Sequence, residues 1–408
     1  MPFRIALSGL NAASADLNVT ANNIANTSTN GFKGSRTEFA DLFAVSLQGV
    51  SSNSSGNGVR VAAVAQQFSQ GNIEFTDSNL DLAVSGQGMF ILSDNGALAY
   101  TRAGAYQMNR DGYVVNSQGQ RLQVYPPIAG GGFNTGGLGD LRLLTTDSAP
   151  QATANVEYVL NLPASATPPP IAAFDPNDPN SFNQATSLTL FDSLGATHTG
   201  TMYFTKTVNP NEWTARMYID GQPVGPGGTP TTLQYTSSGL LQSPAGGQLP
   251  FPAFPTTTGS APLQVTVDIA QSTQFGGNFA VNSVTQDGYT TGRLIGIDIS
   301  DTGVVNARFT NGNSQPLGQI AIANFANPQG LQQLGNTQWA ETFSSGQALR
   351  GQAGNSGFGL VQSGALEGAN VDVTEQLVQM ITAQRNFQAN AQMISTADSI
   401  TQTIINLR

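Results

Sequence analysis

The two ends of this chain carry the same seven-residue pattern of apolar side chains, separated by intervals of four and three. This spacing places each set on one stripe of an α-helix and suits the seam of a coiled coil. The seam residues are Phe3, Leu7, Leu10, Leu17, Ala21 and Ile24 in the first segment, and Val373, Leu377, Met380, Phe387, Ala391, Ile394 and Ile405 in the second. Two distant segments with seams of one type are expected to pair, with the intervening chain looped out. This arrangement favours a filament subunit over an enzyme.

Charge is scarce throughout the sequence. Charged residues make up 10% of the 408 positions, against about 25% in a typical soluble domain. A surface so poor in charge gives weak repulsion between copies and therefore favours self-association into a homopolymer. The net charge of −10 and the lack of any Lys/Arg cluster argue against binding to nucleic acid or to anionic membranes.

The two terminal helices are expected to be covered on several sides. The first 30 residues contain only Arg4 and Asp16 as charges, so the outer face of this helix is neutral. The C-terminal helix is expected to open at Asp372, with Glu375 three residues later as in a capping box. Because most helix stability comes from packing, we expect both ends to be disordered in the free chain and to fold on assembly.

Between the helices the apolar period changes to two, with Gly/Asn/Asp turns that indicate antiparallel strands. The predicted class is therefore α+β and multidomain, with long terminal helices paired as a coiled coil and nested antiparallel β domains between them. The predicted parts are an N-terminal helix with an extended or loop segment (1–70), a β domain in two pieces (71–148 and 286–358), an inserted outer β domain (149–285) and the C-terminal helix (359–408). We also expect a short helical turn at 37–43 and a Ser/Asn/Gly loop at 51–58.

Few residues suggest chemistry. The chain has no cysteine and one histidine, His198, which we interpret as a surface residue of a hairpin, not a metal ligand. Asp77 with Asp81, or Asp298 with Asp301, could form the carboxylate pair of a glycosidase, but such pairs are common by chance among 25 acidic residues. The Asp/Pro/Asn run at 175–180 lacks the ligand spacing of a calcium loop. The sequence therefore predicts no catalytic residue, no cofactor and no metal site.

Nothing near the start resembles a signal peptide, because residues 1–13 lack an unbroken apolar region. No run of 18 apolar residues predicts a transmembrane helix, so no membrane insertion is expected. If the protein is exported, we expect a route that uses no cleaved leader.

Long motifs at both ends resemble those of one known family. The stretches LSGLNAA (7–13) and ANNIANTSTNGFK (21–33) are similar to the N-terminal signature of bacterial flagellar rod and hook proteins. GNIEFT (71–76), LDLAV (80–84) and GQGMF (86–90) resemble the next block of that family. NVDV (370–373), LVQMI (377–381) and QRNF (384–387) resemble its C-terminal signature.

The resemblance implies a tubular homopolymer whose terminal helices form the inner wall, with β domains stacked outside. It also implies contacts with the rod, the hook cap, the hook–filament junction and the flagellar type III export apparatus, and a location in the extracellular flagellum. The insertion, including LTLFDSLG (188–195), resembles the outer domain of hook-type members, which form a curved, flexible, torque-transmitting tube. A distal rod subunit is the alternative within the family, and a secreted carbohydrate-active or adhesive β protein is a remote third.

Overall fold

The chain divides into two compact units in the computed structural model, which describes residues 2–42, 56–128, 130–143, 147–257 and 259–406. Unit 1 comprises Met1–Leu144, Gly296–Ala307 and Gln315–Arg408. Unit 2 comprises Thr145–Ile295 and Arg308–Ser314. Both segments of unit 2 are thus flanked in the sequence by segments of unit 1.

Both predicted terminal helices are present and belong to unit 1: α1 (Pro2–Ala25) and α2 (Val373–Asn406). After α1 the chain turns at Gly31, which has a φ of 68° and lies so close to Ala103 that an added Cβ would be 2.4 Å from its backbone nitrogen. Only glycine fits both conditions. At the start of α2, the Asp372 carboxylate accepts hydrogen bonds from the backbone N–H groups of Thr374 (2.7 Å) and Glu375 (3.0 Å), which confirms Asp372 as the N-cap.

The helical turn predicted at 37–43 is wrong over its described part. These residues lie in β1 (Ser35–Asp41), which pairs antiparallel with β2 (Val59–Gln66) around a bulge at Glu38/Phe39. Thr37 pairs with Val64 and Phe39 with Val61, so β-branched and aromatic side chains meet across the ladder. This distant partner, invisible to local periodicity, decides the conformation. Phe43 and most of the predicted 51–58 loop lie outside the described residues.

A sheet of twelve described strands, most of whose residues belong to unit 1, has apolar cores on both faces. Its central strand β5 (Met89–Asp94) sends Phe90 and Leu92 into one core and Met89 and Ile91 into the other. The remaining strands are β6 (Ala97–Thr101), β7 (Gln107–Met108), β8 (Val114–Val115), β9 (Arg121–Tyr125), β10 (Gly139–Asp140), β21 (Leu294–Ile299), β22 (Val304–Phe309), β23 (Ser314–Asn324), β24 (Gln332–Gly335), β25 (Gln338–Ala340) and β26 (Leu349–Gln352).

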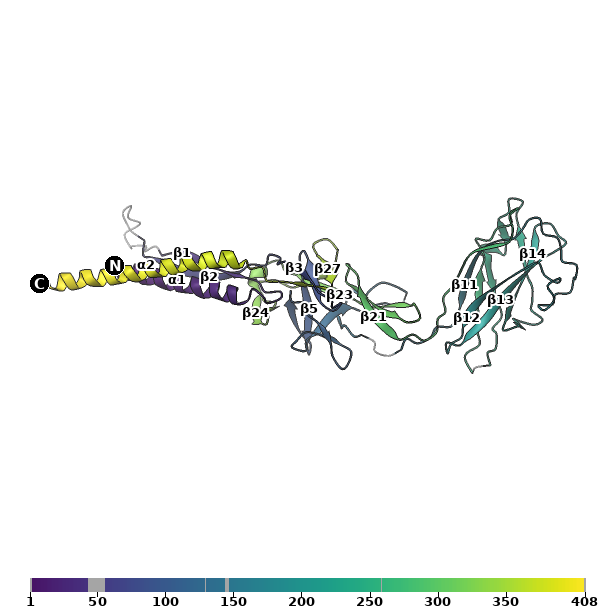
Figure 1. Cartoon of the computed structure of the whole chain (residues 1–408), viewed down its shortest axis with the longest axis horizontal. Helices are drawn as coiled ribbons and strands as arrows, with labels where there is room; N and C mark the ends of the chain where they lie inside the picture. The colour runs from purple at the N-terminus through teal and green to yellow at the C-terminus, as the bar shows by residue number, and fades with distance from the viewer. Residues whose placement is uncertain (1, 43–55, 129, 144–146, 258, 407–408) are drawn as a thin grey trace. The chain divides into compact units, whose positions relative to one another are not determined.

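Two small antiparallel sheets bring the chain ends of unit 1 together. They pair β3 (Ile73–Phe75) with β28 (Ala365–Glu367), and β4 (Leu82–Ser85) with β27 (Leu360–Ser363). Each joins a strand that follows α1 in the sequence to one that precedes α2. The end of α1 and the start of α2 are therefore both connected to these two small sheets (Figure 1).

Unit 2 is a sandwich of two sheets around one apolar core. The first sheet has the order β18 (Gln248–Pro250), β19 (Thr266–Asp268), β11 (Asn155–Asn161), β20 (Ala280–Gln286). The second has the order β12 (Gln184–Phe191), β13 (Thr197–Lys206), β14 (Glu212–Ile219), β16 (Thr231–Tyr235), β17 (Leu241–Ser243), with β15 (Gln222–Pro223) beside β14. One pairing departs from the predicted antiparallel pattern, because β11 and β19 run parallel. The long connection between them permits this.

Each unit buries one tryptophan, Trp213 in unit 2 and Trp339 in unit 1. We expect Leu233→Ala, which empties the buried position paired with Trp213, to destabilise unit 2 by about 2–5 kcal/mol. Denaturant unfolding followed by Trp213 fluorescence in a Trp339→Phe background measures this change. The exposed Leu240→Ala serves as the control, and equal effects of the two substitutions would contradict the assigned core.

Candidate assembly interface

Helices α1 and α2 lie side by side and antiparallel (Figure 1). Near one end of the pair, Asn23 Nδ2 donates a 2.9 Å hydrogen bond to Gln376 Oε1. Near the other, Gly9 faces Asn390 so closely that a Cβ on Gly9 would be 2.4 Å from Asn390 Oδ1. These two contacts are two heptads apart on each helix, so a single register joins the helices along α1.

Small and polar side chains make up the buried part of this helix pair. The buried residues of the two helices are Ala6, Ala12, Ala13, Thr20, Asn23, Gln376 and Ala383. The distance between packed helices depends on the side chains at the contact, so Gly9 and the alanines permit a close approach. Asn23 also fixes the start of β1, because its amide exchanges hydrogen bonds of 2.8 and 2.9 Å with the backbone of Ser35.

The predicted seam residues occupy two kinds of position. Seven are half-buried: Leu10, Leu17, Ile24, Met380, Phe387, Ala391 and Ile394. Six are exposed: Phe3, Leu7, Ala21, Val373, Leu377 and Ile405. The seven half-buried positions are thus partly covered within one chain, and the six exposed positions stay accessible to solvent. Their part in contacts between chains stays a prediction.

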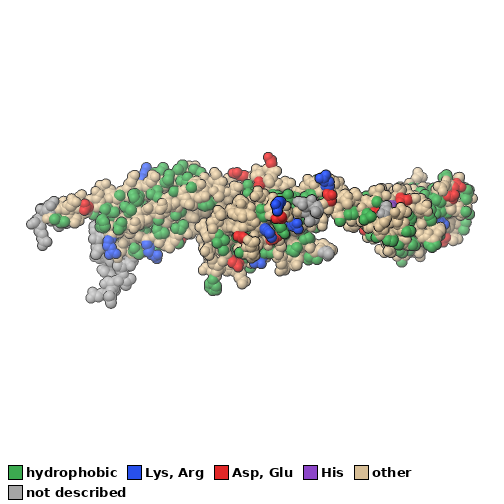
Figure 2. Space-filling view, turned by 90° about the horizontal axis from the view of Figure 1, so that it is seen from below, with side chains coloured by type: hydrophobic (Ala, Val, Ile, Leu, Met, Phe, Trp, Pro, Cys, Tyr) green, Lys and Arg blue, Asp and Glu red, His purple; other side chains and the backbone are tan. Residues whose placement is uncertain are grey.

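Further large apolar side chains of α2 are exposed and were missed by the seam pattern. They are Val378, Ile381, Met393 and Ile400, each about half exposed. The heptad pattern missed these residues because they lie off its stripe. The sequence feature that could have indicated them is the presence of apolar residues on several faces of α2. Figure 2 shows hydrophobic side chains gathered over the helical part of unit 1.

The β1–β2 hairpin lies along α1 and extends this apolar surface. The Ser8 hydroxyl of α1 accepts a 3.2 Å hydrogen bond from the Val59 N–H at the start of β2. The hairpin exposes Phe39, Leu42 and Val64. We call the exposed apolar residues of α1, α2 and this hairpin the assembly surface: Phe3, Leu7, Phe39, Leu42, Val64, Val373, Leu377, Val378, Ile381, Met393, Ile400 and Ile405.

A buried ion cluster holds the base of the helices against the β structure of unit 1. Glu367, with no exposed side-chain surface, lies 2.6 Å from Lys33 Nζ and 3.0 Å from an Arg102 guanidinium nitrogen. It also accepts a 2.9 Å hydrogen bond from the Gly71 N–H. Burial lowers the pKa of Lys33, outweighing the opposite effect of the Glu367 charge. Sequence analysis missed this cluster, although Lys33 closes the 21–33 motif and charges are rare in the chain.

The residues that suggested chemistry occupy structural positions. Asp81 accepts a 2.8 Å hydrogen bond from the Thr76 hydroxyl, and Asp175 and Asp178 accept hydrogen bonds from backbone N–H groups two residues later. Within the described ranges, no group of three or more His, Cys, Asp or Glu side chains is arranged to hold a metal ion. Over the same ranges, no helix combines the length and apolar character needed to cross a membrane.

The interpretation of His198 as a surface residue is wrong. Its side chain is 7% exposed and lies between the carboxylates of Asp192 and Asp220. Burial occurs because strand β13, which carries His198, runs between β12 and β14 in its sheet. The two aspartates come from the turns that end these neighbours.

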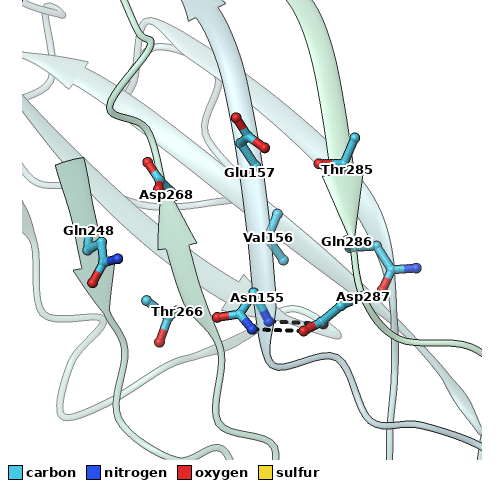
Figure 3. Close-up of a pocket in the computed structure, with 9 residues that line it drawn as sticks. All are labelled: Asn155, Val156, Glu157, Gln248, Thr266, Asp268, Thr285, Gln286 and Asp287. Carbon is cyan, nitrogen blue, oxygen red and sulfur yellow. Dashed lines mark hydrogen bonds between the residues drawn. The ribbon is translucent and has the colours of Figure 1, made fainter. Parts of the chain in front are cut away.

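An acidic hollow lies in unit 2, on the sheet that contains β11 and β19. Its volume is about 410 Å³ and Figure 3 shows its lining, which includes Glu157, Asp268 and Asp287. Each carboxylate accepts hydrogen bonds from its own surroundings: Asp287 from Asn155, Asp268 from the Ala270 N–H and Glu157 from Gln271. These contacts assign the carboxylates to loop and strand stabilisation.

Four family models match successive parts of the chain. They are the flagella basal body rod protein (3–33), the flagellar hook protein FlgE/F/G D1 domain (83–164), the flagellar basal body protein FlaE D2 domain (161–289) and the flagellar basal body rod FlgEFG protein C-terminal region (362–407). The chain is 38% identical to flagellar hook protein FlgE of Escherichia coli strain K12, over the whole of both chains. The chain belongs to the flagellar hook protein family.

More distant members agree with this membership. Flagellar hook protein FlgE of Borreliella burgdorferi is 33% identical to the chain over 98% of both proteins. The crystal structure of Helicobacter pylori flagellar hook protein FlgE2 shares the fold with a TM-score of 0.54 at 15% identity, covering 72% of this chain and all of that one. Full-length similarity to hook proteins favours the hook interpretation over the distal rod alternative.

We expect Glu367→Gln to destabilise unit 1 by about 3–5 kcal/mol, because it leaves Lys33 and Arg102 buried without a counter-charge. Denaturant unfolding followed by Trp339 fluorescence in a Trp213→Phe background measures the loss. The matched control is Glu38→Gln, which breaks the exposed Arg36–Glu38 pair and should cost less than about 1 kcal/mol. Similar losses for both variants would show that the buried cluster does not hold unit 1 together.

Proposed function

We propose that this chain is the structural subunit of the bacterial flagellar hook, and that it polymerises into a tube through its assembly surface. The observation that carries this proposal is the division of side chains on the helix pair. The fully buried side chains of the pair are small or polar, whereas many of its large apolar side chains are exposed. Exposed apolar area on this scale marks an interface in a soluble protein.

The assembly surface supplies the driving force for polymerisation. Fully burying one Leu, Ile, Val, Phe or Met side chain contributes roughly 1.5–3 kcal/mol. Association costs an estimated 4–15 kcal/mol in lost translational and rotational freedom. Twelve partly exposed side chains on three elements let one subunit be covered by more than one neighbour, so addition at an existing tube end is favoured over dimerisation in solution.

The register between Gly9/Asn390 and Asn23/Gln376 supports a coiled-coil arrangement of α1 and α2, which forms the inner wall of the tube in our proposal. We expect this pair to become fully ordered only on assembly, since single helices depend on packing for stability. The family is one of structural flagellar proteins, and its hook is part of the extracellular flagellum. We propose that the subunit reaches it through the flagellar export apparatus and contacts the rod, the hook cap and the hook–filament junction.

Unit 2 suits a part that moves while the tube rotates and bends. Charged residues are few in its sequence, and a large apolar cluster fills the core of the sandwich. Polar contacts between neighbouring copies can be exchanged through water at low cost, which interlocked apolar cores do not allow. We therefore assign rigidity to the helices and compliance to unit 2.

Leu377→Asp tests the assembly surface. A charge at this exposed position should abolish polymerisation, because it cannot be buried without a partner, while both units stay folded. Light scattering during polymerisation measures assembly, and Trp213 and Trp339 fluorescence report folding. The control Leu377→Met keeps an apolar side chain of similar volume and should polymerise. Normal assembly of the Leu377→Asp variant would contradict the proposed interface.

Removal of unit 2 tests the division of labour. The N–H of Ser148 donates a 2.7 Å hydrogen bond to the Gly292 carbonyl, so the insertion leaves and re-enters the chain at adjacent points. Replacing 149–291 by an Asn-Gly turn should leave a tube of altered curvature or stiffness, visible by electron microscopy. Complete loss of assembly in a variant with folded unit 1 would show that unit 2 is required for the wall itself.

A further inference from the structure

Two linker strands carry the chain into and out of unit 2. Residues 148–153 and 287–292 are joined by antiparallel bridges between Ser148 and Gly292 and between Gln151 and Tyr289. The N–H of Gln151 and that of Tyr289 each donate a 2.9 Å hydrogen bond to the other residue's carbonyl. We call these two paired strands the linker ribbon. The contacts between the linker ribbon and the rest of unit 2 therefore limit how far unit 2 can move about its attachment.

The ribbon rests on the turn between β12 and β13, which we call the seat (residues 191–196). The Thr153 N–H donates to the Phe191 carbonyl (2.9 Å), and the Thr153 hydroxyl accepts from the Phe191 N–H (3.0 Å). Gly195 touches both linker strands, since an added Cβ would lie 2.9 Å from Pro150 and 3.2 Å from Thr290. The seat thus contacts both strands at once.

His198 lies next to the seat, between two carboxylates. Its Nδ1 is 2.6 Å from Asp220 Oδ2, and its Nε2 is 3.5 Å from Asp192 Oδ2. The other oxygen of Asp192 shapes the seat, accepting hydrogen bonds from Leu194 N–H (2.9 Å) and Ala196 N–H (2.8 Å). The other oxygen of Asp220 accepts a 2.8 Å hydrogen bond from Thr199 N–H. One imidazole therefore bridges the seat to the turn that follows β14.

We propose that His198 is a proton-dependent clamp: its charged form binds Asp192 and Asp220 and holds the seat rigid, and loss of its proton loosens the seat and frees the linker ribbon. This inference rests on the proposed hook function, in which movement of unit 2 governs bending. It adds a chemical control of that movement by the proton concentration outside the cell.

The electrostatics agree with this geometry. Burial lowers the pKa of His198, but hydrogen bonds and charges from Asp220 and Asp192 outweigh it, so the pKa lies above the ordinary 6.5. These two aspartates are the charged groups that act on the imidazole within the described residues. The pKa of Asp220 is correspondingly lowered from 3.8, chiefly by His198 and the Thr199 N–H against the opposing effect of burial.

The direction of the pH effect follows from linkage. Because the folded pKa of His198 is raised, its stabilising contribution is fully present below the unfolded pKa and is lost as pH rises through the folded value. The contribution of Asp220 is present above its unfolded pKa and is lost as pH falls through the lowered folded value. The clamp is therefore closed at mildly acidic pH and opens on the alkaline side.

The experiment uses the full chain, in which His198 is the one histidine and gives a single imidazole signal in NMR spectra of histidine-labelled protein. We expect a midpoint above 6.5. Hydrogen-exchange protection of Phe191, Thr153 and Gly195, corrected for the intrinsic pH dependence of exchange, should fall through the same midpoint. Asp220→Asn keeps an acceptor for the Thr199 N–H and suits the positive φ of 50°. It should lower the midpoint by about one to two pH units.

A His198→Gln chain should show no pH step in seat protection, and tubes assembled from it should keep one stiffness on both sides of the wild-type midpoint. The clamp would be overturned by either of two results: an imidazole titration midpoint at or below 6.5, or hydrogen-exchange protection of the seat that does not change through that midpoint. If His198→Gln does not fold, the Asp220→Asn variant tests the clamp alone, through the expected lowering of the His198 titration midpoint. Polymerisation is scored separately by light scattering, so a chain that assembles normally without a pH-dependent seat rejects the clamp and leaves the hook function intact.

Discussion

The buried carboxylate of Glu367 joins three parts of unit 1 that are far apart in the sequence. Lys33 comes from the segment after α1, Arg102 follows β6 and Glu367 ends β28, shortly before α2. A lone buried charge is strongly unfavourable, so none of these side chains can take its position without the others. Arg102 extends the connection by donating to the backbone carbonyls of Val84 (3.0 Å) and Gly86 (2.6 Å). The placement of the end of α1 and of the start of α2 against the β structure depends on this cluster.

The side chains of the helix pair must meet two opposing requirements. A subunit must hold its helices together, yet keep enough apolar surface to bind its neighbours. Gly9 and the alanines allow the backbones to approach, and Asn23 with Gln376 fixes the register by a hydrogen bond. Many large apolar side chains of the helices stay exposed, and we propose that contacts between copies cover them. A pair that closed on its largest side chains would be more stable alone and less able to polymerise.

Unit 2 is built around one apolar cluster between its two sheets. Its attachment is a narrow ribbon that rests on a single turn, so a small local change can alter how the whole unit moves. His198 is placed where such a change would act. In a chain with so few charges, one imidazole between two carboxylates is a strong local influence.

The sequence by itself determined both terminal helices, the Asp372 cap, the β character of the middle and the family, because local periodicity, capping and long motifs express these features directly. Tertiary structure alone decided which residues of each helix are fully buried, since heptad spacing cannot show that Asn23 and the alanines are covered while Phe3 and Leu377 are exposed. It also decided that 37–41 form a strand, that β11 and β19 run parallel, that Glu367 gathers Lys33 and Arg102, and that His198 is buried. Each of these depends on a partner distant in the sequence, and a contact between distant residues leaves no local pattern to read.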